Sequence, residues 1–414
     1  MPPKTILILG GSYAGISTAH YILKHVIPSL PSPETYQVIV VSSSKEVVCR
    51  PATPRALLSD TYFDQSKLFV NIKEQFTQYG SKFHFIHGRA KHLDHGRRLV
   101  IIDEITDTTT GAVHNEIQLG YHALVIGTGA STYSPLFSLN SQGKPELIAR
   151  WNEFRSAMAE AKSIVIAGGG PTGVETAGEL GEHINGKAGW FGSKAPKCNI
   201  TLVTSAAELL PQLRPAIAQT AESYLSKLGV EVVKNARVEG VVPTEAGKDA
   251  LTAKTEVKLN NGQSLHADLY IPAYGTIPNS SFLDDSLKAP DGRVATNPTT
   301  LRVDKAGPLV YAAGDVSDYA RAAVHILTEA IPVLCANLKR DLLSDAGQTV
   351  SGEDRIFKVD ESETQLVPIG RAKGVGAAKG YRVPSFFVWL IKGRDYWLGM
   401  TQGTWSGKAW AKEV

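Results

Sequence analysis

The chain of 414 residues is poor in cysteine. Cys49, Cys198 and Cys335 lie far apart and form no Cys-x-x-Cys pair, and neither they nor the histidines have metal-ligand spacing, so we predict no disulfide framework and no metal site. No two cysteines are placed to relay electrons as a dithiol, which argues against a disulfide reductase. This cysteine usage is typical of a cytoplasmic protein.

Long apolar runs and a large net charge are lacking as well. No stretch approaches the roughly 20 apolar residues that span a bilayer, so any membrane contact is expected to be peripheral. The net charge is +3, from 43 basic and 40 acidic residues, and we therefore expect no nucleic-acid partner. The first predicted strand begins at Thr5, which predicts that no targeting peptide precedes it.

Two glycine-rich turns, each directly after a short apolar strand, are the most informative pattern. Ile6–Leu9 leads into Gly10-Gly11-Ser12-Tyr13-Ala14-Gly15, and Ile164–Ala167 leads into Gly168-Gly169-Gly170-Pro171-Thr172-Gly173. Glycine permits a tight turn and close backbone approach, and the following helix N-terminus offers free N–H groups to a pyrophosphate. The two turns predict two bound dinucleotides, a flavin and a nicotinamide, with hydride passing between them.

Both units lack the acidic residue expected after their second strand. Ser42-Ser43-Ser44-Lys45 follows the first such strand, and Thr204-Ser205 follows the other. A carboxylate there binds the adenosine ribose and repels a 2′-phosphate, so the choice between NADH and NADPH stays open. Ser42 or Lys45 is expected to replace it in the first unit.

The middle glycine of the first turn is replaced by Ser12, which is tolerable where the backbone keeps ordinary angles. Further along, Gly314-Asp315 follows an apolar strand. Asp315 is placed to accept a hydrogen bond from a ribityl hydroxyl. A helix starting near Arg321 would point its positive end at the flavin ring.

The alternation of strands and helices predicts an α/β protein of three domains. We expect two Rossmann-like dinucleotide-binding domains and a small C-terminal α+β domain. The FAD domain is discontinuous, over 1–130 and 275–344, with the NAD(P)H domain, 131–274, inserted into it. The C-terminal domain covers 345–414.

The order of the motifs, including Gly127-Thr128-Gly129 and Pro278-Asn279 after Gly275, resembles the two-dinucleotide-binding-domain flavoproteins over almost the whole chain. Within that class the chain is most similar to the apoptosis-inducing-factor-like flavoproteins related to ferroptosis suppressor protein. The tracts that carry this likeness are Gly173-Val174-Glu175 with Glu179, Val367–Gly376 and Lys392–Tyr396. The resemblance implies non-covalent FAD, oxidation of NADH or NADPH as co-substrate, and a quinone or similar small acceptor.

The resemblance also implies roles for particular residues. Arg55 would lie beside the isoalloxazine, Glu175 would face the nicotinamide, and Lys392 would lie near the flavin or the acceptor; these three are the predicted catalytic residues. The other predicted FAD contacts are Gly10, Gly11, Ser12, Tyr13, Ala14, Gly15, Ser42, Lys45, Arg50, Thr128, Gly129, Gly314 and Asp315. The other predicted NAD(P)H contacts are Gly168, Gly170, Pro171, Thr172, Gly173, Thr204 and Gly275.

The C-terminal segment is rich in tryptophan, with four of six in the last 26 residues, among lysines and Arg394. We interpret Phe386–Ile391 as a buried strand and helix. The alternative is a surface that touches lipid and admits a lipophilic quinone, because aromatic residues with basic neighbours suit membrane interfaces.

Other functions remain open. The chain could reduce a small iron–sulfur protein, monodehydroascorbate or a specialised metabolite. A non-enzymatic NAD(P)H sensor or a DNA-associated signalling flavoprotein is a further alternative. We expect a monomer or a homodimer.

Overall fold

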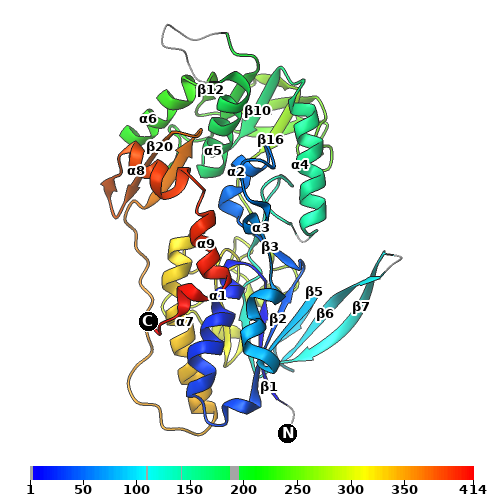
Figure 1. Cartoon of the computed structure of the whole chain (residues 1–414), viewed down its shortest axis with the longest axis vertical. Helices are drawn as coiled ribbons and strands as arrows, with labels where there is room; N and C mark the ends of the chain where they lie inside the picture. Colours follow the sequence, from blue (N-terminus) through cyan, green and yellow to red (C-terminus); the bar gives the residue numbers. More distant parts are fainter. Residues whose placement is uncertain (1–2, 109–110, 141, 187–194) are drawn as a thin grey trace.

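The computed structural model describes residues 3–108, 111–140, 142–186 and 195–414. Figure 1 shows two bodies of sheet and helix, one above the other along the long axis. The first body, at the bottom, is built on a seven-stranded sheet of order β18-β8-β1-β2-β5-β6-β7. Its strands are β1 (Lys4–Leu9), β2 (Tyr36–Ser42), β5 (Phe83–Asp94), β6 (Leu99–Thr108), β7 (Gly111–Gly120), β8 (Ala123–Ile126) and β18 (Val310–Ala312).

The central strands of this sheet are parallel and buried. β1 pairs in parallel with both β2 and β8, and the run Ile6–Leu9 is at most 1% exposed. Such a strand is covered on both faces, which explains its continuous apolar sequence. Helices α1 (Tyr13–Tyr21) and α7 (Val324–Asp345) lie side by side against it (Figure 1).

The second body repeats the same plan with fewer strands. Its four-stranded sheet has the order β12-β11-β10-β16, and every pair is parallel. The fold-class prediction, a parallel-sheet Rossmann-like core used twice, is confirmed. The elements of this body are α4 (Lys144–Met158), β10 (Ser163–Ala167), α5 (Pro171–Leu180), β11 (Asn199–Val203), α6 (Pro215–Ser226), β12 (Val230–Val233), β16 (Leu269–Pro272), and an antiparallel sheet of β13 (Val238–Val242), β14 (Thr255–Leu259) and β15 (Ser264–Ala267).

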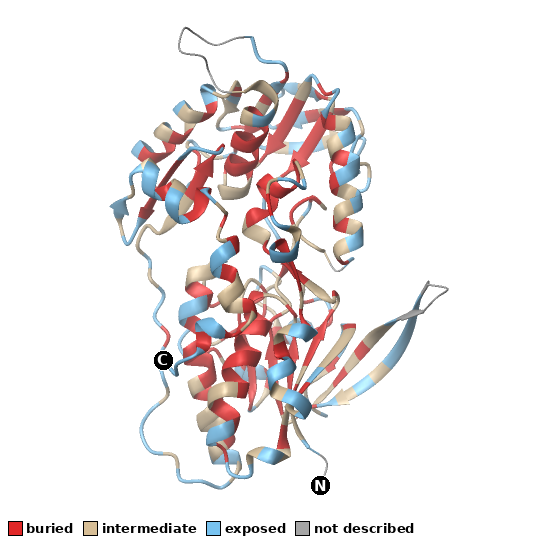
Figure 2. Cartoon of the chain, viewed as in Figure 1, coloured by how far each residue is buried: buried red, intermediate tan, exposed pale blue. Residues whose placement is uncertain are grey.

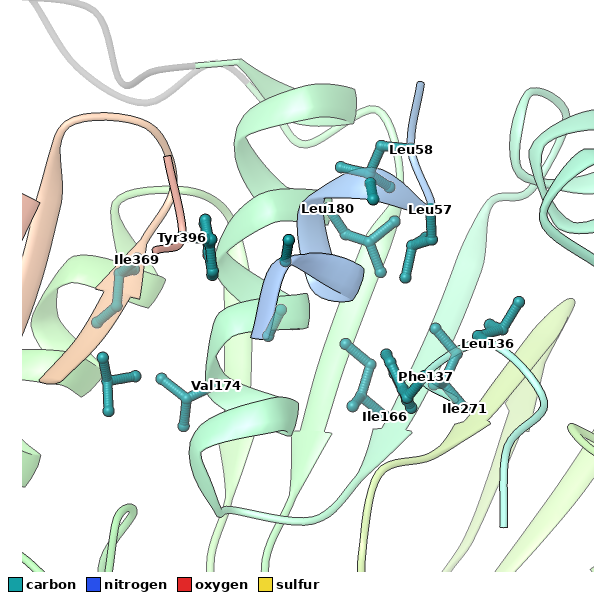
Figure 3. Close-up of a cluster of buried hydrophobic side chains, with 14 of the residues drawn as sticks. Leu57, Leu58, Leu136, Phe137, Ile166, Val174, Leu180, Ile271, Ile369 and Tyr396 are labelled. Atoms are coloured by element: carbon teal, nitrogen blue, oxygen red, sulfur yellow. The ribbon is translucent and has the colours of Figure 1, made fainter. Parts of the chain in front are cut away.

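Short elements fill the region between the two bodies. They are β3 (Glu46–Val48) paired with β4 (Phe69–Asn71), β9 (Ala130–Ser131) paired with β17 (Ile277–Pro278), α2 (Thr53–Ala56) and α3 (Gln65–Leu68). Figure 3 shows α2 and the leucines after it packed over α5. A segment of the first body therefore contributes to the core of the second.

The C-terminal residues connect the two bodies. After α7 the chain runs up the outside as an extended segment (Figure 1). It then forms β19 (Gln365–Ile369), β20 (Lys373–Ala378), β21 (Tyr381–Arg382), α8 (Ser385–Val388) and α9 (Leu398–Trp405). Residues of β19 and β20 join the core of the second body, whereas Trp405 and Trp410 join the core around α1.

The expectation that Phe386–Ile391 is a buried strand and helix is wrong. The segment is α8 followed by a π-helical turn, Trp389–Gly393. Phe386, Phe387 and Ile391 are 61%, 50% and 49% exposed, while Val388 is buried against β20. A single helical turn can direct only one side of its surface inward, and here Val388 occupies that side. Figure 2 shows α8 with pale blue, exposed turns.

Among the described residues, no helix is both long and apolar enough to cross a bilayer. We keep 1–130 with 275–344, 131–274 and 345–414 as our proposed division into domains.

Candidate active site

A cavity of about 790 Å³ is lined by residues of both bodies and of the C-terminal segment. This volume is in the range of cofactor and ligand sites. The predicted FAD residues that line it are Gly10, Gly11, Ser12, Tyr13, Ala14, Ser42, Arg50, Thr128, Gly129, Gly314 and Asp315. The predicted NAD(P)H residues that line it are Pro171, Thr172 and Glu175.

The first glycine turn has the shape that a pyrophosphate needs. Gly10 has φ +118°, and a Cβ there would collide with the carbonyl oxygen of Gly127. Ser12 has φ −124° and ψ −154°, an extended conformation open to any residue. The serine in place of the middle glycine therefore costs no backbone strain. Gly15 lies outside the cavity wall, packed against the carbonyl of Gly10.

The second turn has the same shape. Gly168 has φ +129°, and a Cβ there would collide with the carbonyl of Ala273. Apart from Gly170 and the residues adjoining it in the turn and helix, no described heavy atom lies within 4 Å of where a Cβ on Gly170 would stand, so the turn is open there. The residues fit a dinucleotide. The remaining predicted NAD(P)H residues, Gly168, Gly170, Gly173, Thr204 and Gly275, do not line the large cavity.

Thr204 lies directly behind the second turn. Its hydroxyl oxygen accepts a hydrogen bond from the backbone N–H of Ala206 at 3.3 Å. A Cβ on Gly169 would collide with the same oxygen, so the turn packs closely on Thr204. Lys45 of the first unit does not line the cavity, whereas its neighbour Ser44 does.

Asp315 lies at the edge of the cavity beside the start of α7. It faces Arg50, with 3.5 Å between Oδ2 and Nη1, and Arg50 also donates to the carbonyl of Ala130 at 3.2 Å. The residues Ala322–Val324 line the cavity, so α7 presents its N-terminal end to it. The helix begins at Val324 rather than near Arg321, and its dipole favours negative charge at this place.

Asn279 was not among the predicted contacts, although Pro278-Asn279 belongs to the quoted motif. Its side chain donates to the carbonyl of Thr128 at 2.9 Å and accepts from the hydroxyl of Ser131 at 2.8 Å. Asn279 borders the cavity as well. Asn279 fixes the loop that carries Thr128 and Gly129. The Pro278-Asn279 motif is the sequence signal from which this role could have been predicted.

Glu175 and Lys392 form an ion pair in the cavity wall, although 217 residues separate them. The ammonium nitrogen lies 2.5 Å from Oε1 of Glu175 and 3.1 Å from the carbonyl oxygen of Leu366. The two residues are 3% and 6% exposed. Burial raises the pKa of Glu175 to about 6, and the charge on Lys392 opposes that rise. The sequence prediction brought these two residues to one site, but it did not identify them as partners.

Arg55, which the resemblance predicts beside the isoalloxazine, is not among the residues that line the cavity. Its guanidinium makes two hydrogen bonds to the carboxylate of Glu179, Nε–Oε2 at 3.0 Å and Nη2–Oε1 at 2.7 Å. It also donates to the backbone carbonyls of Gly393 at 2.8 Å and Gly370 at 3.2 Å. Arg55 is only 5% exposed, and the carboxylate of Glu179 neutralises its charge inside the protein. Through these hydrogen bonds Arg55 links α2, α5 and the C-terminal segment.

Tyr396 completes this cluster. Its hydroxyl donates to Oε1 of Glu179 at 3.0 Å, and its ring lies 4.7 Å from the guanidinium of Arg55. Figure 3 shows Tyr396 and Ile369 on one side of α5 and the leucines after α2 on the other. The next residue, Trp397, lines the cavity and was missed, because the tract that carried the resemblance ends at Tyr396.

The sequence matches the pyridine nucleotide-disulphide oxidoreductase family over residues 4–331. The chain belongs to that family. The oxidoreductase phnG of Penicillium herquei is 57% identical over 99% of this chain and 97% of its own length. Ferroptosis suppressor protein 1 of Xenopus laevis is 24% identical over 94% of this chain and 92% of its own length. The structure of NDH2 from Plasmodium falciparum in complex with NADH shares the fold, with a TM-score of 0.65 at 14% identity and 99% coverage of both chains.

These comparisons confirm the predicted resemblance and enzyme class. The protein is an FAD-dependent NAD(P)H oxidoreductase. FAD, when bound, supplies the two-electron chemistry that links NAD(P)H to an acceptor. The family name refers to disulphides, but Cys49, Cys198 and Cys335 are free and buried, and none lines the cavity.

Replacing Glu175 by Gln tests its role toward the nicotinamide. An ionised carboxylate is the stronger acceptor for N–H groups, so we expect the KM for NAD(P)H to rise about tenfold, equivalent to about 1.4 kcal/mol. In the parent protein this KM should also rise as the pH falls through about 6, where Glu175 gains a proton. The glutamine variant should lack that pH step. A matching loss of bound FAD would instead assign Glu175 a structural role.

Replacing Arg55 by Met leaves the carboxylate of Glu179 buried and unpaired. Breaking a buried ion pair costs about 3–5 kcal/mol, so the free energy of unfolding in urea should fall by that order. The double variant Arg55→Met with Glu179→Leu removes both charges and should recover much of the loss. If the single variant is as stable as the parent protein, the ion pair does not hold the three segments together.

Proposed function

We propose that this flavoprotein passes the electrons of NAD(P)H to a quinone or a similar small acceptor. The overall reaction is NAD(P)H + H⁺ + quinone → NAD(P)⁺ + hydroquinone, in which the acceptor gains two electrons and two protons. The observation that carries the proposal is a single cavity. It extends from the first glycine turn to the start of α5 and is also lined by Lys392 and Trp397 from the C-terminal segment.

The chemistry of the cavity wall supports a small acceptor. No cysteine lines the cavity, so electrons have no thiol to pass through among the described residues. Lys392 places a positive charge in the buried cavity wall. There it favours the negative charge that develops on a ring oxygen of the acceptor. Glu175 holds that lysine in place and is the group we assign to orienting the nicotinamide.

An apolar patch lies on the surface next to this wall. It consists of Phe386, Phe387, Leu390 and Ile391, which are 39–61% exposed. In the turn Trp389–Gly393, Ile391 faces outward and its neighbour Lys392 is buried at the cavity. Exposed basic residues occur on the same segment: Lys379, Arg382 and Arg394. We assign this surface to peripheral contact with an anionic lipid surface, from which a lipophilic acceptor is taken.

The acceptor is tested with the flavin-loaded enzyme. NADH and NADPH are first compared for anaerobic bleaching of the flavin absorption. The reduced enzyme is then mixed with 1,4-naphthoquinone, monodehydroascorbate, a small iron–sulfur protein or a disulfide. We expect rapid re-oxidation by the quinone and hydroquinone as its product. Bleaching by NAD(P)H with no re-oxidation by quinones would overturn the proposal while leaving the enzyme class intact.

The lipid contact is tested by cosedimentation with vesicles of phosphatidylcholine and phosphatidylserine. Phe387→Glu places a charge in the patch, and the lost burial of a phenylalanine, about 2 kcal/mol, should weaken binding by at least tenfold. Val113→Glu on β7 is the matched control, because Val113 is 43% exposed and β7 lies far from α8 (Figure 1). Equal binding by the two variants would exclude the patch as the contact.

A further inference from the structure

The indole of Trp397 carries a buried hydrogen-bond donor that has no acceptor among the described residues. Buried polar groups in proteins are nearly always paired. Trp405 and Trp410 also lack an acceptor, but they pack in the core around α1. Trp397 differs because it is one of the residues that line the large cavity, where a ligand can supply the missing acceptor.

The backbone at Trp397 is strained. Tyr396 and Trp397 have φ values of 50° and 65°, so two successive aromatic residues adopt the left-handed conformation. Residues other than glycine seldom do so, and such strain persists only where surrounding contacts enforce it. Here the N–H of Tyr396 donates to the carbonyl of Lys392 at 2.6 Å, and the N–H of Trp397 donates to Oδ1 of Asp395 at 3.0 Å. This conformation occurs where the C-terminal segment reaches the cavity wall, at Trp397.

A positive charge lies against the same ring. The ammonium nitrogen of Lys392 is 4.8 Å from the centre of the Trp397 ring, within the range of a cation–π contact. The ammonium already has two acceptors, Glu175 and the carbonyl of Leu366. An ammonium group has three N–H donors, so one of them remains, and the indole N–H next to it adds a second donor for a ligand. A donor beside a positive charge suits a carbonyl oxygen, which carries partial negative charge.

We propose that the indole N–H of Trp397 donates a hydrogen bond to a ring carbonyl oxygen of the quinone acceptor. This inference rests on the proposed quinone reduction. The predicted FAD contacts that line the cavity come from the first body, whereas Trp397 and Lys392 come from the segment that carries the exposed apolar patch. That origin favours the acceptor over the flavin as the partner of Trp397.

Kinetics of Trp397→Phe provide the first test. Phenylalanine keeps an aromatic ring and removes the N–H donor. We expect kcat/KM for 1,4-naphthoquinone to fall about tenfold relative to kcat/KM for ferricyanide, which accepts electrons without a carbonyl group. Trp389→Phe is the matched control, because Trp389 lies in the same segment but does not line the cavity, and its ratio should equal that of the parent protein. An unchanged ratio in Trp397→Phe overturns the inference.

Binding is tested separately by the indole N–H resonances of the ¹⁵N-tryptophan-labelled, oxidised, FAD-loaded enzyme. The resonance missing from Trp397→Phe should shift when 1,4-naphthoquinone is added, and the one missing from Trp389→Phe should not. If the quinone is turned over but the Trp397 resonance does not move, the contact is absent. If the parent enzyme is bleached by NAD(P)H but reduces no quinone, the proposed function fails and this inference fails with it.

Discussion

The buried pair of Arg55 and Glu179 is the contact on which the geometry of the site depends. Arg55 comes from α2, Glu179 from α5, and both bond or pack against the C-terminal segment. Neither charge is tolerable alone in a dry interface, so the three segments must assemble together. Glu175 lies one helical turn before Glu179, and Lys392 directly precedes Gly393. The ion pair therefore sets the position of both charged groups in the cavity wall.

The spacing along α5 explains why two cations are needed. Glu175 and Glu179 are four residues apart, so they lie on one face of the helix, where like charges repel. The charge on Glu179 contributes to the raised pKa of Glu175. Each carboxylate has its own cation, Lys392 for one and Arg55 for the other. Gly178 lies between them, and a Cβ there would press on the backbone at Gly370, so the helix and β19 can approach closely only because this position is glycine.

The parts of the site that could be predicted from the sequence are the local ones. A strand, a glycine turn and a helix are consecutive in the chain, so the shape at Gly10 and Gly168 follows from nearby residues. The partners of Arg55 could not be predicted in this way, because these contacts join residues more than a hundred positions apart. The contacts of Trp397 with Lys392 and Asp395 are local, but its place at the cavity depends on how the C-terminal segment packs. The exposure of Phe387 was missed for a different reason, because a single helical turn is too short to show a hydrophobic periodicity.

Two parts of the cavity wall come from different parts of the chain. The wall of the cavity around the first glycine turn is built within the first body and is held by contacts such as that between Asn279 and Thr128. The part of the wall at Lys392 and Trp397 comes from the C-terminal segment, which Arg55 binds through the carbonyls of Gly393 and Gly370. Under the proposed function, flavin binding and acceptor binding therefore rest on different contacts. The strained backbone at Trp397 belongs to the second set, where the surrounding contacts are dense enough to maintain it.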